Sequence, residues 1–164
     1  DVLTGLPTGP AFAAAAERDR KLAERLGRRL MLILAEPRDI SAISEMQGTE
    51  KKDLIMMEAA DQMRGLAGPA DLLGKASDTR FALAIFDTPV ESVECAWSRI
   101  HHEAADHRIS IGAAILDSEH PAGLDSLFDQ AARDLSLDNS SPFSALAGRS
   151  SILGSQNKTA GMRT

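Results

Sequence analysis

The stretch Leu73–Asp87, LGKASDTRFALAIFD, decides the fold of this chain. Its second half is apolar on both alternations, as is typical of a strand that is covered on two faces. A shorter strand is expected over Asp71–Ala76, and the polar residues Ser77–Arg80 separate it from the longer one. Small and polar residues of this kind favour a tight turn. The stretch therefore predicts a β-hairpin whose second strand covers Arg80–Phe86.

The composition indicates one soluble globular domain. The chain has 164 residues, of which 43% are hydrophobic and 26% are charged. A net charge of −6 argues against broad nucleic-acid binding and against docking on an anionic membrane. No apolar run reaches the ~18 residues of a membrane span, so no direct membrane insertion is expected. The single cysteine, Cys95, excludes an internal disulfide, which fits a cytoplasmic location.

Helices and strands alternate around the hairpin. The most apolar run, Leu30–Ala35, reads as a buried central strand, and Arg108–Leu116 reads as a further strand. Apolar stripes at helical spacing predict helices over about 10–26, 40–47, 49–65, 88–104 and 124–135. This order predicts an α/β (α+β) sandwich with a mixed central sheet.

Two boundaries follow from local chemistry. Thr88–Glu91 has the pattern of a capping box with proline at the first helical position, so we expect a helix to begin there. Beyond Asn139 the chain is rich in Ser, Gly, Thr and Asn. We therefore expect a domain over residues 1–139 and a linker or flexible tail over 140–164.

Several segments, in this order and spacing, resemble GGDEF domains, the bacterial diguanylate cyclases. Asp1–Pro7 resembles the D-x-L-T-G-L-P segment of that family, and Ser110–Ala114 resembles its S-I-G-V-A strand. The hairpin Leu73–Phe86 lies where the family has its signature hairpin, and Leu127–Asn139 resembles its final helix. The resemblance covers about residues 1–139.

The resemblance implies a fold related to nucleotide-cyclase and polymerase palms, with a ferredoxin-like core. In the family, two domains meet, each holds one GTP, and metal ions activate a hydroxyl to form cyclic di-GMP. Carboxylates from two adjacent strands hold the metals, because Mg²⁺ takes oxygen ligands and bridges the triphosphate.

The signature itself is lost. Its five positions fall on Ser77, Asp78, Thr79, Arg80 and Phe81, and only the phenylalanine is retained. Arg80 takes the place of the metal-binding carboxylate, and a guanidinium cannot ligate Mg²⁺ because it has donors only. Asp78 takes the place of a glycine, where a negative side chain opposes a triphosphate.

Other family positions are mostly altered as well. Glu36 takes the place of the first metal aspartate and is the only metal-ligand candidate. Asp53 matches a guanine-reading residue, whereas Ser44 replaces the asparagine that reads guanine with it. Ser41 and Asn139 replace two lysines that contact phosphate. Only weak nucleotide binding, through Asp53 and Ser44, is expected to remain.

Two structural expectations follow from these replacements. The family's product site lies just ahead of the hairpin; here Asp71 is retained but Gly68 replaces the arginine, so no tight binding of cyclic di-GMP is expected. At the metal position the Arg80 guanidinium is expected to take the place of the cation and pair with Glu36. The alternative is that Arg80 points into solvent.

The functional expectation is a non-catalytic, GGDEF-like regulatory or dimerisation module of a larger cyclic di-GMP signalling protein. Its expected partners are other domains of the same polypeptide, such as a sensor or a phosphodiesterase, and a second copy. No nucleic acid and no cofactor are expected. One alternative is a sensor that binds GTP through Asp53 and Glu36 without turnover; a cyclase with unorthodox ligands is less favoured. GTP and Mg²⁺ would belong to these alternatives only. The remaining reading is an unrelated ferredoxin-like interaction domain.

Overall fold

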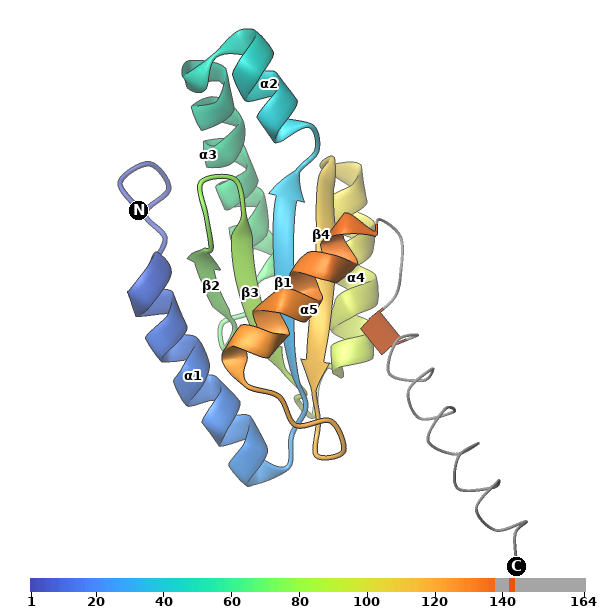
Figure 1. Cartoon of the computed structure of the whole chain (residues 1–164). Helices are drawn as coiled ribbons and strands as arrows, with labels where there is room; N and C mark the ends of the chain where they lie inside the picture. The colour runs from blue at the N-terminus through green and yellow to red at the C-terminus, as the bar shows by residue number, and fades with distance from the viewer. Residues whose placement is uncertain (138–141, 144–164) are drawn as a thin grey trace, which may run out of the picture.

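The structure, a computed structural model, describes residues 1–137 and 142–143 (Figure 1). Within them the chain forms the helices and strands α1 (Gly9–Leu26), β1 (Leu30–Pro37), α2 (Ile40–Gln47), α3 (Thr49–Leu66), β2 (Leu72–Lys75), β3 (Phe81–Phe86), α4 (Val93–Asp106), β4 (Ile109–Leu116) and α5 (Leu124–Ser136). The predicted hairpin is β2 and β3, and the predicted central strand is β1.

The four strands form one sheet in the order β2-β3-β1-β4, and each neighbouring pair is antiparallel. The α/β sandwich built around a hairpin is confirmed, but the expected mixed sheet is wrong. β1 and β2 run in the same direction, yet β3 lies between them; β3 and β4 also run together, with β1 between them. In the described part of the chain, parallel pairing is limited to one isolated bridge, Thr8 with Lys75.

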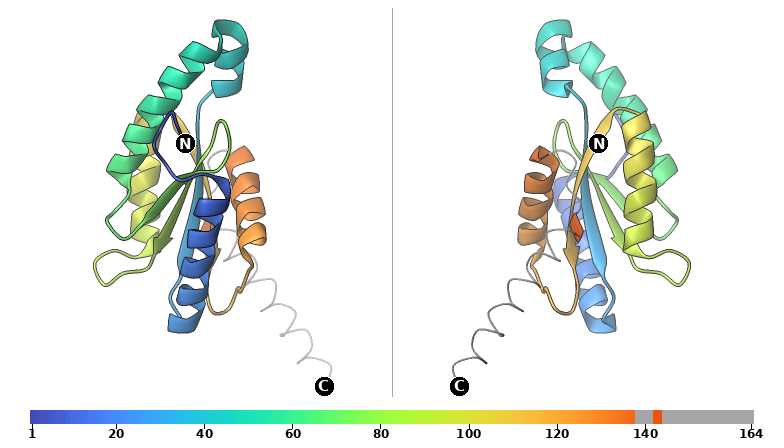
Figure 2. Two further views of the ribbon diagram at one scale, coloured as in Figure 1. Left: turned by 90° about the vertical axis from the view of Figure 1, so that its left-hand side faces the viewer. Right: turned by 90° about the vertical axis from the view of Figure 1, so that its right-hand side faces the viewer.

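Helices cover both faces of the sheet, as Figure 2 shows from two sides. α3 and α4 pack on one face, and α1 and α5 pack on the other. β1 serves both faces: Met31, Ile33 and Ala35 belong to the first core, and its leucines 30, 32 and 34 belong to the second. This is why the LMLILA run is apolar without alternation.

A glycine lets α5 approach the sheet closely. A Cβ atom placed on Gly112 of β4 would lie 2.1 Å from the backbone nitrogen of Leu135 and 2.6 Å from the carbonyl oxygen of Ala131. No side chain fits between the two backbones. The S-I-G segment of β4 therefore sets the position of α5, which in turn borders the candidate site described below.

The start of α4 differs from the expectation. Thr88 and Glu91 close a turn instead of capping a helix: the Thr88 hydroxyl accepts a hydrogen bond from the Glu91 backbone nitrogen at 2.9 Å. The helix begins at Val93, and Ser92 caps it by accepting a hydrogen bond from the backbone nitrogen of Cys95 at 3.2 Å. The Thr88 hydroxyl is thus used by the backbone of its own turn.

The end of the expected domain, Asn139, lies outside the described residues, as does most of the expected tail. Residues 142–143 are described: Pro142 is buried, and Phe143 packs half-buried against the core on the α3 and α4 face. None of the helices in the described ranges combines the length and the apolar character that crossing a bilayer requires.

Candidate functional site

The candidate site lies where β1 ends beside the hairpin turn. The turn is closed by the carbonyl oxygen of Arg80, which accepts hydrogen bonds from the backbone nitrogens of Ala76 at 2.9 Å and Ser77 at 3.2 Å. The last ladder pair of β1 and β3 joins Ala35 with Phe81. The next residue of β1, Glu36, therefore faces the last residue of the turn, Arg80.

Glu36 and Arg80 form the expected ion pair. The Arg80 Nε atom donates to the Glu36 Oε2 atom at 2.9 Å, and the Thr79 hydroxyl donates to the same oxygen at 3.0 Å. The side chains of Arg80 and Glu36 are 35% and 28% exposed. At such exposure a single pair is worth about 0.2–1 kcal/mol. The guanidinium thus occupies the place at the Glu36 carboxylate where a cation is expected.

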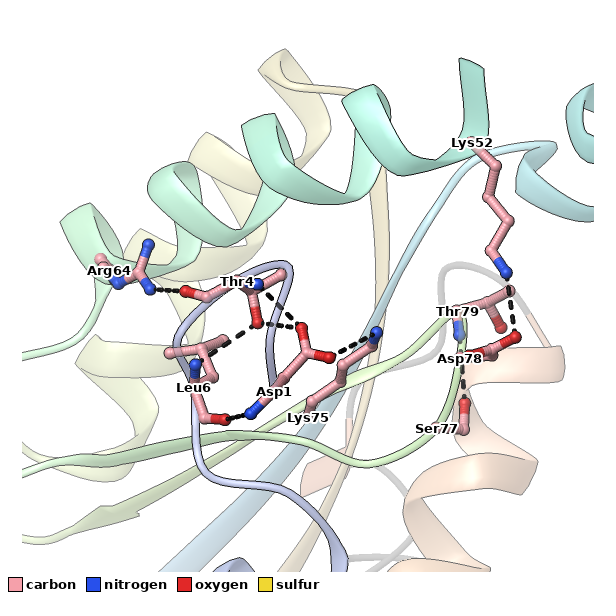
Figure 3. Close-up of polar contacts among 9 residues, drawn as sticks. All are labelled: Asp1, Thr4, Leu6, Lys52, Arg64, Lys75, Ser77, Asp78 and Thr79. Atoms are coloured by element: carbon pink, nitrogen blue, oxygen red, sulfur yellow. Dashed lines mark hydrogen bonds and ion pairs between the residues drawn. The ribbon is translucent and has the colours of Figure 1, made fainter. Parts of the chain in front are cut away.

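A second ion pair ties the turn to α3, as Figure 3 shows. Lys52 Nζ lies 2.9 Å from Asp78 Oδ2; the lysine side chain is only 14% exposed, whereas that of Asp78 is 86% exposed. The hydrogen bond from Lys52 lowers the pKa of the Asp78 carboxyl. The sequence did not predict this pair, because its partners lie 26 residues apart on a helix and a turn.

The first residues of the chain contact the turn end of β2. The Asp1 carboxylate accepts hydrogen bonds from the backbone nitrogen of Thr4 at 2.9 Å and from its hydroxyl at 2.5 Å, and Lys75 Nζ of β2 lies 3.5 Å from the other carboxylate oxygen (Figure 3). Arg64 of α3 donates to the Thr4 carbonyl oxygen. The D-x-L-T segment thereby links β2 to α3.

A cleft of about 540 Å³ opens between the hairpin turn and α5. Its polar lining consists of Glu36, Ser41, Ser77, Thr79, Arg80 and Asp129. This volume lies within the usual range of small-molecule sites. Sequence reasoning missed Asp129, because the apolar stripe of this helix indicates only its packing face.

Other predicted residues lie outside this lining. Phe81 is fully buried in the core on the α3 and α4 face. Ser44 is half-buried on α2 and Asp53 is half-buried on α3, and neither borders the cleft. Asn139 is not among the described residues. The structure thus brings the signature turn and Glu36 together at the cleft, and the two guanine-reading positions are not among the residues that line it.

The residues at the site do not fit a magnesium ion. Mg²⁺ requires near-octahedral oxygen coordination, and here an Arg80 nitrogen, which can only donate, faces the Glu36 carboxylate. Within the described residues, no group of three or more His, Cys, Asp or Glu side chains is placed to hold a metal ion. The donor set is that of an ion pair.

Asp71, at the position of the family's product site, is likewise bound by the chain itself. Asp71 Oδ2 accepts a hydrogen bond from the Gly68 backbone nitrogen at 2.7 Å. The Arg99 guanidinium, in turn, donates hydrogen bonds to the Glu91 carboxylate at 3.0 Å and to the Leu66 carbonyl oxygen at 2.9 Å. The hydrogen bond to Glu91 is the main cause of the raised pKa of Arg99, to which the negative charge of Asp71 also contributes.

The sequence matches no protein-family model and no curated protein. Solved structures match its fold. The GGDEF domain of DgcB from Caulobacter crescentus, crystallised with c-di-GMP, is 18% identical with a TM-score of 0.72, covering 84% of this chain and 87% of that one. The FimX GGDEF domain from Pseudomonas aeruginosa is 21% identical with a TM-score of 0.71, covering 83% and 90%.

The active GGEEF domain of a diguanylate cyclase from Vibrio cholerae is 16% identical with a TM-score of 0.67, covering 79% of this chain and 88% of that one. These identities are too low to transfer an activity. The structural matches agree with the antiparallel sheet, the hairpin and the helices on both faces of the sheet. The chain described here therefore has the fold of the GGDEF family.

Proposed function

We propose that this chain is a non-catalytic GGDEF-fold module that regulates, or dimerises within, a larger bacterial cyclic di-GMP signalling protein in the cytoplasm. The observation that carries the proposal is the Glu36–Arg80 ion pair at 2.9 Å. It places a fixed positive charge at the carboxylate that would otherwise receive a metal ion.

The chemistry of phosphoryl transfer explains why this matters. Catalysis depends on metal ions and cationic groups that stabilise the charge spread over the phosphoryl oxygens. Losing one comparable contact costs about 10²–10³ in rate. Here Arg80 replaces a metal ligand, and Asp78 adds a negative charge to the turn while it engages Lys52. Both replacements weaken the stabilisation of the negative charge on the phosphoryl oxygens, so we expect no measurable synthesis of cyclic di-GMP.

The expected partners are other domains of the same polypeptide and a second copy of the chain. Similar proteins support this class of role. DgcB has been crystallised as a coiled coil with its GGDEF domain, and SiaD, of which this chain spans 55%, has been crystallised in complex with its activator SiaC. In both examples a protein similar to this chain is combined with a further element, a coiled coil in one case and an activator protein in the other.

A second candidate function is GTP sensing without turnover. The cleft of about 540 Å³ favours it, since this volume accommodates a small molecule. The half-buried positions of Ser44 and Asp53 outside the cleft lining speak against it. Calorimetric titration of the full chain with GTP separates the two functions, because only the sensor releases or absorbs saturable heat.

The proposal is tested by incubating the full chain with GTP and Mg²⁺ or Mn²⁺ and separating the products chromatographically. We expect no cyclic di-GMP above the no-enzyme control, whereas an active diguanylate cyclase run in parallel yields product. Product that forms with this chain and disappears in its Glu36→Ala variant would overturn the proposal. That variant separates turnover by this chain from a contaminating cyclase.

A further inference from the structure

A second cavity, of about 260 Å³, lies at the same end of β1 but on the side of α2 and α3. Aliphatic side chains from four elements line it: Ile43 of α2, Ile55 and Ala59 of α3, Ile109 of β4 and, from the end of β1, Pro37. It shares no residue with the cleft at the hairpin turn. Nothing in the proposed function uses it.

Arg108, which lines this cavity, and Asp39, just outside the lining, have left-handed backbone conformations. Asp39 and Arg108, with φ angles of 60° and 58°, are the non-glycine residues with positive φ in the described part of the chain. They lie on facing loops, which are joined by a hydrogen bond from the Arg38 backbone nitrogen to the Arg108 carbonyl oxygen at 2.9 Å. Strain of this kind costs free energy and often marks a functional surface.

The strained loops present two arginines at the cavity. Arg38 and Arg108 both line it and are both exposed. Arg108 makes only a marginal contact with Asp39, at 3.9 Å between two side chains that are about three-quarters exposed. In the described residues Arg38 has no ion pair through its guanidinium. Among the lining residues two arginines stand against one acidic residue, Glu58, so the lining is net positive on a chain of net charge −6. Asp39 adds a negative charge beside Arg108, outside the lining, so Arg38 is the arginine that is open to a partner's carboxylate.

The size of the cavity indicates what it holds. About 260 Å³ is below the usual range of small-molecule sites, about 300–1,000 Å³, and fits one large apolar side chain. Leu54, one turn before Glu58 on α3, is 62% exposed, so apolar surface continues beyond the rim. Binding energy in protein–protein contacts concentrates in side chains that fill such pockets, and arginine is enriched at these sites.

We propose that this cavity binds an acidic peptide segment of a partner protein. One apolar side chain of the segment enters the aliphatic cavity, and flanking carboxylates pair with Arg38 and Arg108. The arginine fork favours carboxylates through paired hydrogen bonds. The proposal is independent of GTP and of catalysis, so its failure and that of the proposed function are distinguishable.

The probe is a capped five-residue peptide with phenylalanine between two pairs of glutamates, titrated into the full ¹⁵N-labelled chain. Two control peptides replace the glutamates by glutamines, or the phenylalanine by alanine. We expect saturable amide shifts confined to residues 38, 43, 54–62 and 107–109, and at least fivefold weaker binding of both control peptides. Added NaCl weakens binding because it screens exposed charges.

The matched protein variants are Arg38→Gln with Arg108→Gln, against Arg18→Gln, an exposed arginine on α1. We expect at least fivefold weaker binding in the first and unchanged binding in the second, with both spectra retaining native dispersion. Arg108→Gly removes the guanidinium but suits the positive φ, so it weakens binding even if the double variant is unstable. Shifts centred on the hairpin cleft, equal binding of the glutamine peptide, or no shifts at millimolar peptide would overturn the proposal.

Discussion

Two arginine–carboxylate clusters stand at opposite ends of the β1–β3 pair, and they differ in strength. Arg29, just before β1, binds the Asp87 carboxylate just after β3 through two hydrogen bonds, at 2.7 and 3.1 Å, and also binds Glu94 of α4. At the other end Arg80 binds Glu36 through one hydrogen bond of 2.9 Å. The first cluster has the paired geometry of a strong contact, and the second does not.

The two clusters have different roles in the molecule. Asp87 also accepts a hydrogen bond from the Val93 backbone nitrogen at 2.9 Å, so the Arg29 cluster joins two strands to the start of α4. The Glu36–Arg80 pair instead borders a cleft and joins the end of β1 to a turn. The first cluster joins elements of the fold; the second lies at the positions that the resemblance assigns to the family's metal site.

The largest expected effect concerns the packing of α5 on β4, which borders the cleft at the Glu36–Arg80 end of the strand pair. In Gly112→Val the new Cβ atom would collide with the backbone of Leu135, so α5 must move away from β4. We expect a loss of about 3 kcal/mol or more in the free energy of unfolding, measured by urea denaturation. In the control Gly65→Ala, no atom lies within 4 Å of the new Cβ, and the change should stay below about 1 kcal/mol. Equal midpoints of the two variants would contradict the packing account.

The next effect compares the two arginines directly. Arg29→Gln removes charged hydrogen bonds to two carboxylates, and we expect a loss of about 1–2 kcal/mol after allowing for their partial exposure. Arg80→Gln removes one exposed pair, so its cost should be about 0.2–1 kcal/mol. Urea denaturation at low salt measures both. A loss in Arg80→Gln as large as in Arg29→Gln would show that the two clusters do not differ.

A smaller effect is the pH dependence of the Arg29 cluster. Its hydrogen bond lowers the pKa of Glu94 below the ordinary value of 4.5. A carboxyl group whose pKa is lower in the folded state stabilises that state at any pH above its pKa in the unfolded chain. This stabilisation is lost as the pH falls through the pKa of the folded state. The stability difference between the wild type and Arg29→Gln should be full at neutral pH and shrink below pH 4.5. A difference that grows on acidification would contradict the assignment.

Much of the fold could be predicted because its determinants are local. The LMLILA run, the turn over Ser77–Arg80 and the helix Ile40–Gln47 each follow from a continuous segment. Strand order does not, since apolar periodicity does not say which strand lies between two others. The position of β3 between β1 and β2 depends on contacts between residues far apart in the sequence, and it makes the sheet antiparallel where a mixed sheet was expected.

The contacts at the candidate site were also predictable only in part. The Glu36–Arg80 pair could be predicted because the resemblance aligned both positions on neighbouring strands. The Lys52–Asp78 pair and the facing strained residues Asp39 and Arg108 could not, because each depends on loops meeting in space. The capping role expected of Thr88 failed because the hydroxyl had a nearer backbone partner in its own turn.

The central claim is that Arg80 stands in place of a metal ion, and Mg²⁺ titration of the thermal midpoint tests it most directly. A ligand that binds only the folded state raises the midpoint with its concentration. For the wild type we predict no rise with MgCl₂ beyond that of NaCl at equal ionic strength. For Arg80→Glu, which places a second carboxylate beside Glu36, we predict a rise specific to Mg²⁺. A specific rise in the wild type, or none in Arg80→Glu, would contradict the account.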